Sequence, residues 1–196
     1  MKKGRITAAE AMARLNADPE FVARRDLAER ERERCEAALR RAEAPLIDDV
    51  REAGVDIATV WDLVNTSAPY SALLPILLNH LRRPYPGAVR DGIARALAVP
   101  EARFCLGELI DRYRAEREER PKDGLAAAIG AVAVDGDLND VIMLLREPEN
   151  GPSRMLLLSA LERSRAPQAK ATLREFEHDP EIGKEVQRIL SGRRRG

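Results

Sequence analysis

The residue types that most often carry chemistry are scarce in this chain of 196 residues. There are two histidines, His80 and His178, and two cysteines, Cys35 and Cys105. No histidine belongs to an HExxH or HxH motif, and no cysteine has a CxxC or CxH neighbour at metal-ligand spacing. Glycine-rich phosphate-binding loops and the GxSxG nucleophile motif do not occur in the sequence either. We therefore predict no catalytic residue, no metal site and no cofactor, and a protein that is not an enzyme.

These four residues have structural explanations instead. His80 falls beside the apolar face of a predicted helix, where we expect it to be a satisfied helix residue. His178 precedes a turn, where a histidine commonly meets free carbonyl groups. Cys105 lies within the helical pattern FCLGELI and is expected to be a small buried apolar side chain. Two isolated cysteines make no disulfide framework, which fits a reducing cytoplasm.

Apolar residues recur at helical spacing in two interleaved series. The first has the spacing i, i+3, i+4, i+7, and its members start 32, 32 and 31 residues apart, at Leu74, Leu106, Leu138 and Ala169. The second has the spacing i, i+3, i+4, and its members start 32, 32 and 29 residues apart, at Ile93, Leu125, Leu157 and Val186. Two series with one period predict a unit of two helices, A and B, used four times. The predicted pairs cover residues 70–98, 101–134, 137–164 and 167–191.

Prolines mark the predicted turns independently of the apolar period. One stands at or just before the start of each predicted B helix: Pro86, Pro121, Pro152 and Pro180. A proline fits the first helical turn because its φ angle is fixed and its missing N–H would have no partner there. The helix pairs are therefore predicted by two kinds of residue.

The repeats resemble a known family. The segment LLPILLNHLRRPYPGAVRDGIARAL, residues 73–97, is similar to a HEAT repeat, with Pro75 early in helix A and Val89-Arg90 opening helix B. The segment LNDVIMLLREPENGPSRMLLLSALE, residues 138–162, is similar too, with Arg154 at the arginine position and Glu147 near the turn acid of the family. The resemblance to HEAT-repeat (armadillo-like) proteins covers about residues 70–191.

The pattern of the family is incomplete here. Arg83 stands where the first repeat should have its turn acid, the second repeat lacks the proline of helix A, and Gly183 takes the basic position in the fourth. Arg90, Lys122 and Arg154 lie 32 residues apart and supply a basic residue at that position in three repeats.

The resemblance implies an all-α fold, a right-handed α–α superhelix of about four HEAT-like helix pairs. It implies that the B helices line a concave side. It also implies a structural ladder in which Arg90, Lys122 and Arg154 bond turn carboxylates of neighbouring repeats, with Glu147 and Asp123 as expected partners.

The repeat region is expected to cover residues 55–191, including an irregular end helix at residues 56–65 and its Trp61. Residues 1–54 are expected to form an N-terminal helical arm, and residues 192–196, with Arg193 to Arg195, a basic tail.

The arm itself is predicted from capping signals. Thr7 with Glu10 predicts the start of a short helix, and Asp18-Pro19 predicts the start of a long charged helix. Pro45 is expected to break or kink that helix before a separate short helix that ends at Gly54. The charged helix lacks a clean heptad repeat, so we expect a solvated helix and a monomer, with a weak dimer through the arm as the alternative.

The charge balance limits the partners. The chain has 33 basic and 33 acidic residues, so no overall field attracts nucleic acid or an anionic membrane. The N-terminus shows no signal peptide, and the uncharged run at residues 124–134 is only 11 residues long, against about 20 needed to span a bilayer. We predict a cytoplasmic protein that binds a protein or peptide rather than nucleic acid or a membrane.

The partner is expected on the concave side, at positions of the B helices that the apolar series leave free. Those positions are Asp91, Arg95, Ser159, Glu162, Gln187 and Arg188. Our first hypothesis is a non-enzymatic scaffold, of which an inhibitor or immunity-type protein for a toxin is one form. The alternative is a HEAT-fold enzyme acting on nucleic acid, similar to alkylpurine DNA glycosylases, to which only Trp61 and Asp62 invite comparison. A role similar to that of bilin lyases is a third hypothesis.

Overall fold

A computed structural model describes residues 7–193, and the side chains of residues 10, 11 and 193 lie outside that description. The predicted capping role of Glu10 and most of the predicted basic tail therefore fall outside the described part of the chain. Residues 7–193 form eleven α-helices and no strand, so the predicted all-α class is confirmed. The α-helices are α1 (Ala8–Asn16), α2 (Pro19–Glu52), α3 (Val60–Asn65), α4 (Leu74–Leu81), α5 (Gly87–Ala96), α6 (Leu106–Ala115), α7 (Glu119–Val132), α8 (Leu138–Arg146), α9 (Arg154–Arg163), α10 (Pro167–Glu175) and α11 (Gly183–Arg193). Four short 3₁₀ helices are η1 (Ser71–Leu73), η2 (Pro100–Cys105), η3 (Asp135–Asp137) and η4 (Pro148–Ser153).

The chain divides into two compact units, Met1–Arg41 and Ala42–Gly196. In the first unit, Asp18 caps α2 because its Oδ1 accepts hydrogen bonds from the backbone N–H of Glu20 at 3.0 Å and of Phe21 at 3.4 Å. The charged surface of α2 carries exposed ion pairs such as Arg32 with Glu29 at 2.7 Å. Exposed pairs of this kind contribute little stability, so the helix depends on its capping and its helix-forming residues.

Pro45 lies inside α2, so the predicted separate helix after this residue is wrong, whereas a kink at Pro45, the other alternative, stays a prediction. The proline removes one backbone donor, but the residues that follow it bury apolar surface in the second unit, where Leu46 and Val50 are fully buried. The helix ends at Glu52, and Gly54 follows with a φ angle of 89°. The N–H of Gly54 bonds to the Arg51 carbonyl and that of Val55 to the Val50 carbonyl, which is the Schellman pattern.

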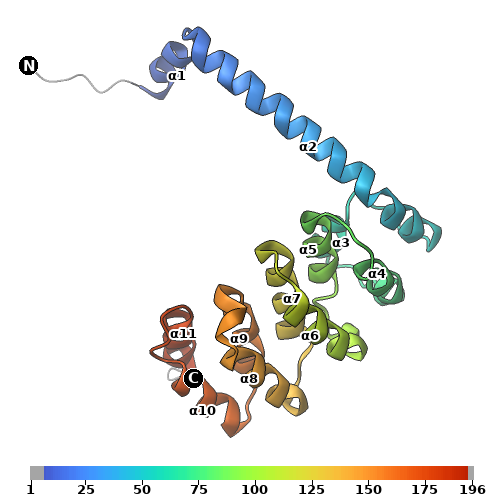
Figure 1. Cartoon of the computed structure of the whole chain (residues 1–196), viewed down its shortest axis with the longest axis vertical. Helices are drawn as coiled ribbons and strands as arrows, with labels where there is room; N and C mark the ends of the chain where they lie inside the picture. The colour runs from blue at the N-terminus through green and yellow to red at the C-terminus, as the bar shows by residue number, and fades with distance from the viewer. Residues whose placement is uncertain (1–6, 194–196) are drawn as a thin grey trace, which may run out of the picture. The chain divides into compact units, whose positions relative to one another are not determined.

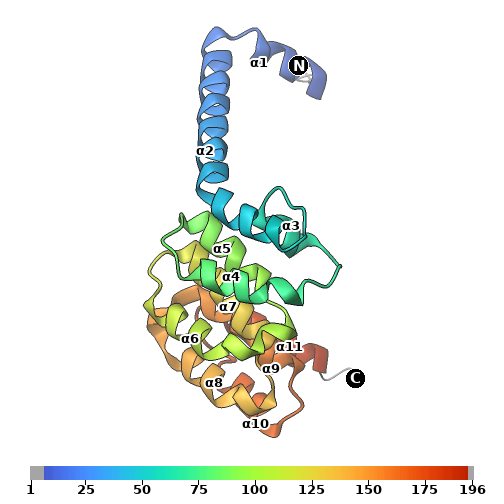
Figure 2. The same ribbon diagram turned by 90° about the vertical axis from the view of Figure 1, so that its right-hand side faces the viewer.

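In the second unit, each member of the two predicted apolar series begins in a helix of its own. The A-series helices α4, α6 and α8 begin 32 residues apart, at Leu74, Leu106 and Leu138. Each packs against the B-series helix that follows it, and α5, α7, α9 and α11 pack against one another in turn. Figure 1 shows these helices as two rows, with α4, α6, α8 and α10 in one and α5, α7, α9 and α11 in the other. Figure 2 shows the same stacking from the side of the A series.

The apolar core runs between the two rows. Leu77, Ile93, Leu109, Ile129 and Leu145 are fully buried there. None of the helices among residues 7–193 combines the length and the apolar character that crossing a bilayer requires.

Two glycines let α5 approach α3 on one side and α7 on the other. A Cβ atom added to Gly92 of α5 would lie 2.3 Å from Cγ1 of Val60 on α3. One added to Gly124 of α7 would lie 2.9 Å from the backbone carbonyl oxygen of Asp91 on α5. Cβ atoms essentially never make contacts this short, so a larger residue at either position would force its neighbours to shift. The close approach places the Asp91 side chain directly against α7.

Candidate functional site

The candidate site is built around a buried carboxylate, Asp91 on α5. Its side chain is 4 % exposed and pairs with two arginines, one on the next turn of α5 and one on α7. Arg95, four residues later on α5, donates from Nε to Oδ1 at 2.7 Å. Arg120, in the first turn of α7, donates from Nε to Oδ2 at 3.1 Å. One carboxylate therefore fixes two guanidinium groups from two helices.

Trp61 on α3 extends this cluster to a third helix. The guanidinium carbon of Arg120 lies 6.0 Å from the centroid of the Trp61 ring, at the limit of a cation–π contact. The indole also packs against α5, because a Cβ atom on Gly92 would come within 3.4 Å of it. We call Trp61, Asp91, Arg95 and Arg120 the arginine cluster.

Further carboxylates surround the arginine cluster. Asp123, on the next turn of α7, is half-buried. Burial raises the pKa of its carboxyl above the usual value, and the charge of Glu119 raises the pKa further, whereas the charge of Arg95 lowers it. The surroundings of the two arginines are thus acidic on the α7 side.

A groove opens beside Arg95. It has a volume of about 500 Å³ and lies between the segment after α3 and the segment that connects α5 with η2. Its lining combines apolar groups with hydroxyl groups, and includes Val64, Thr66, Tyr70, Val99 and Glu101. The Tyr70 hydroxyl donates to the Ala96 carbonyl at 2.9 Å, and burial, followed by the charge of Glu101, raises its pKa. This bond joins the two walls of the groove.

Asp62 does not face the arginine cluster as a free acid. Its Oδ2 accepts hydrogen bonds from the backbone N–H of Ala58 at 2.8 Å and of Thr59 at 3.0 Å. With the Thr59 hydroxyl, it forms a capping box at the start of α3. The carboxylate is therefore used to start a helix.

The six predicted partner-binding residues fall in two places. Asp91 and Arg95 come together in the arginine cluster, where Asp91 is buried rather than open to a partner. The other four lie on α9 and α11, where Arg188 pairs with Glu162 at 3.3 Å and with Glu185 at 2.7 Å.

Two of the six make local bonds to the backbone. Ser159 is half-buried and donates to the Leu156 carbonyl at 2.9 Å. Gln187 is exposed and donates to the Glu177 carbonyl, also at 2.9 Å. These contacts fix each side chain on its own surface and involve no neighbour in the arginine cluster.

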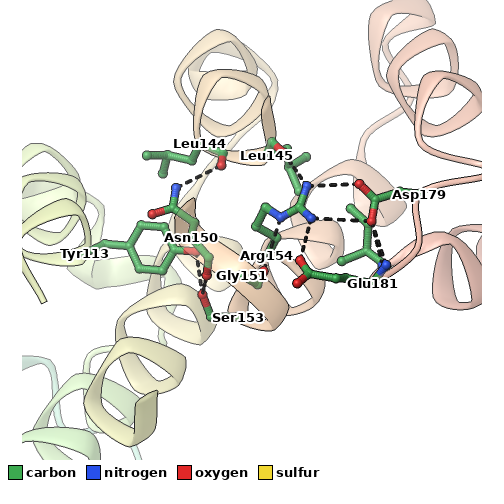
Figure 3. Close-up of polar contacts among 10 residues, drawn as sticks. Tyr113, Leu144, Leu145, Asn150, Gly151, Ser153, Arg154, Asp179 and Glu181 are labelled. Atoms are coloured by element: carbon green, nitrogen blue, oxygen red, sulfur yellow. Dashed lines mark hydrogen bonds and ion pairs between the residues drawn. The ribbon is translucent and has the colours of Figure 1, made fainter. Parts of the chain in front are cut away.

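The basic positions of the predicted ladder have different partners. Arg90 donates to Glu116 and to Glu118, which lie in the turn between α6 and α7. Arg154, with a side chain only 5 % exposed, pairs with Asp179 at 3.1 Å and Glu181 at 2.6 Å before α11. It also donates to two carbonyl groups, those of Leu145 and Gly151, as Figure 3 shows. Both arginines thus bond carboxylates that come later in the chain, in the turn of the next helix pair.

Lys122 occupies the middle position without a carboxylate at ion-pair distance among the described residues. Its Nζ lies 5.0 Å from the centroid of the Tyr113 ring, and the residue is only 8 % exposed. Burial lowers its pKa, and Arg117 lowers it further, against the opposite effect of nearby glutamates. Glu147, an expected ladder partner, bonds Arg114 at 2.8 Å instead.

The Tyr113 ring beneath Lys122 is itself anchored. Its hydroxyl lies 2.7 Å from Ser153 Oγ, which donates to the Asn150 carbonyl, as Figure 3 also shows. Burial raises the pKa of Tyr113 to about 12, so this hydroxyl keeps its proton.

A second series of arginines, which the sequence analysis did not predict, also joins the helix pairs. Arg82, Arg114 and Arg146 also lie 32 residues apart, at the ends of α4, α6 and α8. Each bonds a glutamate of the next helix pair, with distances of 2.6 Å to Glu108, 2.8 Å to Glu147 and 2.8 Å to Glu175. The same 32-residue period was the signal that could have revealed them.

His80 has partners on both ring nitrogens, as expected of a satisfied helix residue. Its Nε2 lies 2.7 Å from Asp49 Oδ2 and its Nδ1 lies 2.7 Å from the Tyr85 hydroxyl. Burial lowers its pKa, and the hydrogen bond to Asp49 partly offsets the effect. Asp49 lies on α2, 31 residues earlier, and nothing in the sequence indicated this pairing.

The arrangement as a whole offers fixed charges and hydrogen-bond donors on an all-helical framework. Among residues 7–193, no three histidine, cysteine, aspartate or glutamate side chains cluster in a way that could hold a metal ion. The chain matches no family model, and comparisons with curated proteins and with solved structures give no significant match. Its function is therefore argued from the geometry alone.

Proposed function

We propose that this protein is a HEAT-like scaffold that binds a protein or peptide partner on the face formed by the B-series helices. In this proposal the four helix pairs make a right-handed superhelix, and the row α5, α7, α9 and α11 lines its inner side. The regular spacing of the helix pairs supports it, as does the series Arg82, Arg114 and Arg146, which links each pair to the next. Stacked repeats of this kind form extended surfaces suited to macromolecular partners.

The observation that carries the proposal is the arginine cluster and its groove on one face of the B-series row. Interfaces are enriched in tryptophan, tyrosine and arginine, because these side chains combine apolar area with directed hydrogen bonds. Here Trp61, Tyr70, Arg95 and Arg120 lie on neighbouring elements and are held by contacts within the protein. A surface fixed in this way loses little conformational entropy when it binds.

An enzyme acting on nucleic acid has no comparable support. Asp62, the residue that suggested a glycosylase, spends its carboxylate on capping α3. Trp61 is covered on one side by Arg120. The face also carries Glu101, Glu119 and Asp123, which would repel a phosphate backbone.

The proposed function is tested by capturing partners from a lysate of the native cells on the immobilised full chain. The matched bait is the double variant Arg95→Glu and Arg120→Glu, which reverses the charge of the B-series face. The control is Arg174→Glu, which changes an exposed arginine of α10 in the other row. We expect one protein to be enriched by the natural chain and by the control and lost from the double variant.

Two results would contradict the proposal. One is the absence of any protein enriched on the natural chain over an unrelated bait. The other is retention of the full chain on duplex DNA in a salt-dependent manner, which would favour the nucleic-acid alternative. Equal melting temperatures of the three baits would show that the substitutions change the surface and not the stability of the fold.

A further inference from the structure

The two arginines of the cluster each use one nitrogen and keep the others available. Arg95 and Arg120 both bond Asp91 through Nε. Within residues 7–193, neither Nη1 nor Nη2 of either residue donates a hydrogen bond. The side chains are 32 % and 61 % exposed, so these nitrogens can reach a partner. A guanidinium held at Nε presents its remaining donors in a fixed plane, which is the geometry that carboxylates recognise.

The groove gives this donor pair an apolar neighbour. Arg95 lies at the boundary, since it belongs both to the arginine cluster and to the lining of the groove. The apolar part of the lining includes Val64, Pro69, Val99 and Ala127. A volume of about 500 Å³ lies within the range of about 300–1,000 Å³ that is typical of ligand pockets.

We propose that Arg95 and Arg120 bind one carboxylate side chain of a peptide segment whose neighbouring apolar residue enters the groove. This inference rests on the proposed function and names the chemistry of the partner: an aspartate or glutamate followed by an apolar residue. Asp91 acts as the positioning residue, because its buried carboxylate sets the direction of both guanidinium groups. Trp61 lies beneath the Arg120 guanidinium, 6.0 Å from ring centroid to guanidinium carbon.

The surrounding carboxylates explain why the site takes a single negative charge. Two arginines and Asp91 leave one net positive charge at the centre of the cluster. Asp123 and Glu119 on the α7 side, and Glu101 in the groove, would lie close to any second negative group of the ligand. A chain of phosphates therefore meets more repulsion than a single carboxylate that contacts only the two guanidinium groups.

The test uses the full chain labelled with nitrogen-15 and two synthetic peptides. The first is acetyl-Ser-Glu-Leu-Ser-amide, and the second replaces its glutamate by glutamine. In NMR titrations, we expect the acidic peptide to shift the Nε–Hε signals of Arg95 and Arg120 and the amide signals of Tyr70 and Ala127. We expect the glutamine peptide to bind roughly tenfold more weakly, a difference of about 1.4 kcal/mol, because a neutral amide oxygen is a weaker acceptor than a carboxylate.

Variants of the protein complete the test. Arg95→Gln and Arg120→Gln are each expected to reduce binding of the acidic peptide to the level of the glutamine peptide. Arg174→Gln, at an exposed position of α10 in the other row, is the matched control and should bind like the natural chain. Binding that is equal for both peptides, signals that shift elsewhere, or no shift at millimolar peptide would overturn the inference.

The two proposals can fail separately. If a captured partner binds the natural chain and the variants Arg95→Gln and Arg120→Gln equally well, the scaffold function stands and the carboxylate site is wrong. If the acidic peptide binds at the arginine cluster while no protein is captured, the carboxylate site stands and the scaffold proposal fails.

Discussion

Arg154 and Lys122 occupy the same position in two helix pairs and do different things there. Arg154 forms a network with two carboxylates and two backbone carbonyl groups. Lys122 lies over the Tyr113 ring at 5.0 Å with no carboxylate at ion-pair distance in the described part of the chain. Both residues are nearly fully buried. One basic position is therefore a junction between helix pairs, and the other is a buried charge held mainly by an aromatic face.

The difference comes from the neighbours rather than from the repeat. Near Lys122, Glu147 is already bonded by Arg114 and by the Asn150 side chain. A lysine also offers a point charge on a flexible stem, whereas the arginine fork can bond several oxygens at once. The 32-residue period places a basic residue, but its chemistry depends on which acid of the next turn remains free.

The largest expected effect is at the junction around Arg154. Arg154→Ala leaves Asp179 without its cation and removes the donors to the carbonyl groups of Leu145 and Gly151. Removing one partner of a buried ion pair typically costs about 3 kcal/mol or more of unfolding free energy. Denaturant unfolding monitored by circular dichroism measures the change.

The control for this change is Arg174→Ala, on the exposed face of α10. It should alter the unfolding free energy by less than about 0.5 kcal/mol, as expected of a surface position. An Arg154→Ala variant as stable as this control would show that the junction does not hold the last helix pair.

The middle position should respond in the opposite direction. Lys122→Met keeps an unbranched apolar stem over Tyr113 and removes a buried charge that has no carboxylate at ion-pair distance. We expect a gain of about 1 to 2 kcal/mol in unfolding free energy, as seen when buried charged groups are replaced by apolar ones. A loss of stability would mean that the cation–π contact outweighs the cost of burying the charge.

The pH dependence of this gain has a defined sign. Burial lowers the pKa of Lys122 in the folded protein below its usual value of 10.5. At a pH between the pKa of Lys122 in the folded protein and its pKa in the unfolded chain, the unfolded chain binds more protons than the folded protein. The contribution of Lys122 to stability therefore rises with pH in this range. The advantage of Lys122→Met should be largest at neutral pH and should disappear above pH 10.5. An advantage that stays constant over this range would contradict the assigned cause.

Tyr113→Phe separates the aromatic ring from its hydroxyl. The ring beneath Lys122 remains, but Ser153 Oγ loses the hydroxyl that lies 2.7 Å from it. We expect a loss of about 1 kcal/mol in unfolding free energy, the usual effect of one buried hydrogen bond. The pKa of Lys122, followed by NMR, should stay low. A return of that pKa towards its usual value would show that the hydroxyl network, and not burial, determines it.

Much of the fold could be predicted because buried residues repeat. Leu74, Leu106 and Leu138 begin helices at the predicted places, since each must bury the same apolar stripe. The continuation of α2 through Pro45 was not predicted, because the sequence displays the missing donor but not the burial of Leu46 and Val50 beside it. The apolar period thus predicted the helices of the repeats, whereas the continuation of α2 through Pro45 depends on tertiary packing.

The candidate site could be predicted only where its contacts are local. Asp91 and Arg95 are four residues apart on one helix, so their pairing follows from spacing alone. Arg120 and Trp61 join them through helix packing that depends on Gly92 and Gly124. The sequence shows these glycines, but it does not show which residue of a neighbouring helix packs against each of them.

The smallest expected effect is in the second arginine series. Arg146 and Glu175 bond at 2.8 Å, yet their side chains are 56 % and 45 % exposed. Water screens such a pair, so Arg146→Ala should cost only about 0 to 0.5 kcal/mol in unfolding free energy, and less at high salt. Denaturant unfolding at low and high ionic strength checks both statements. An effect as large as that of Arg154→Ala would mean that the 32-residue period, rather than burial, determines how strongly each arginine joins neighbouring helix pairs.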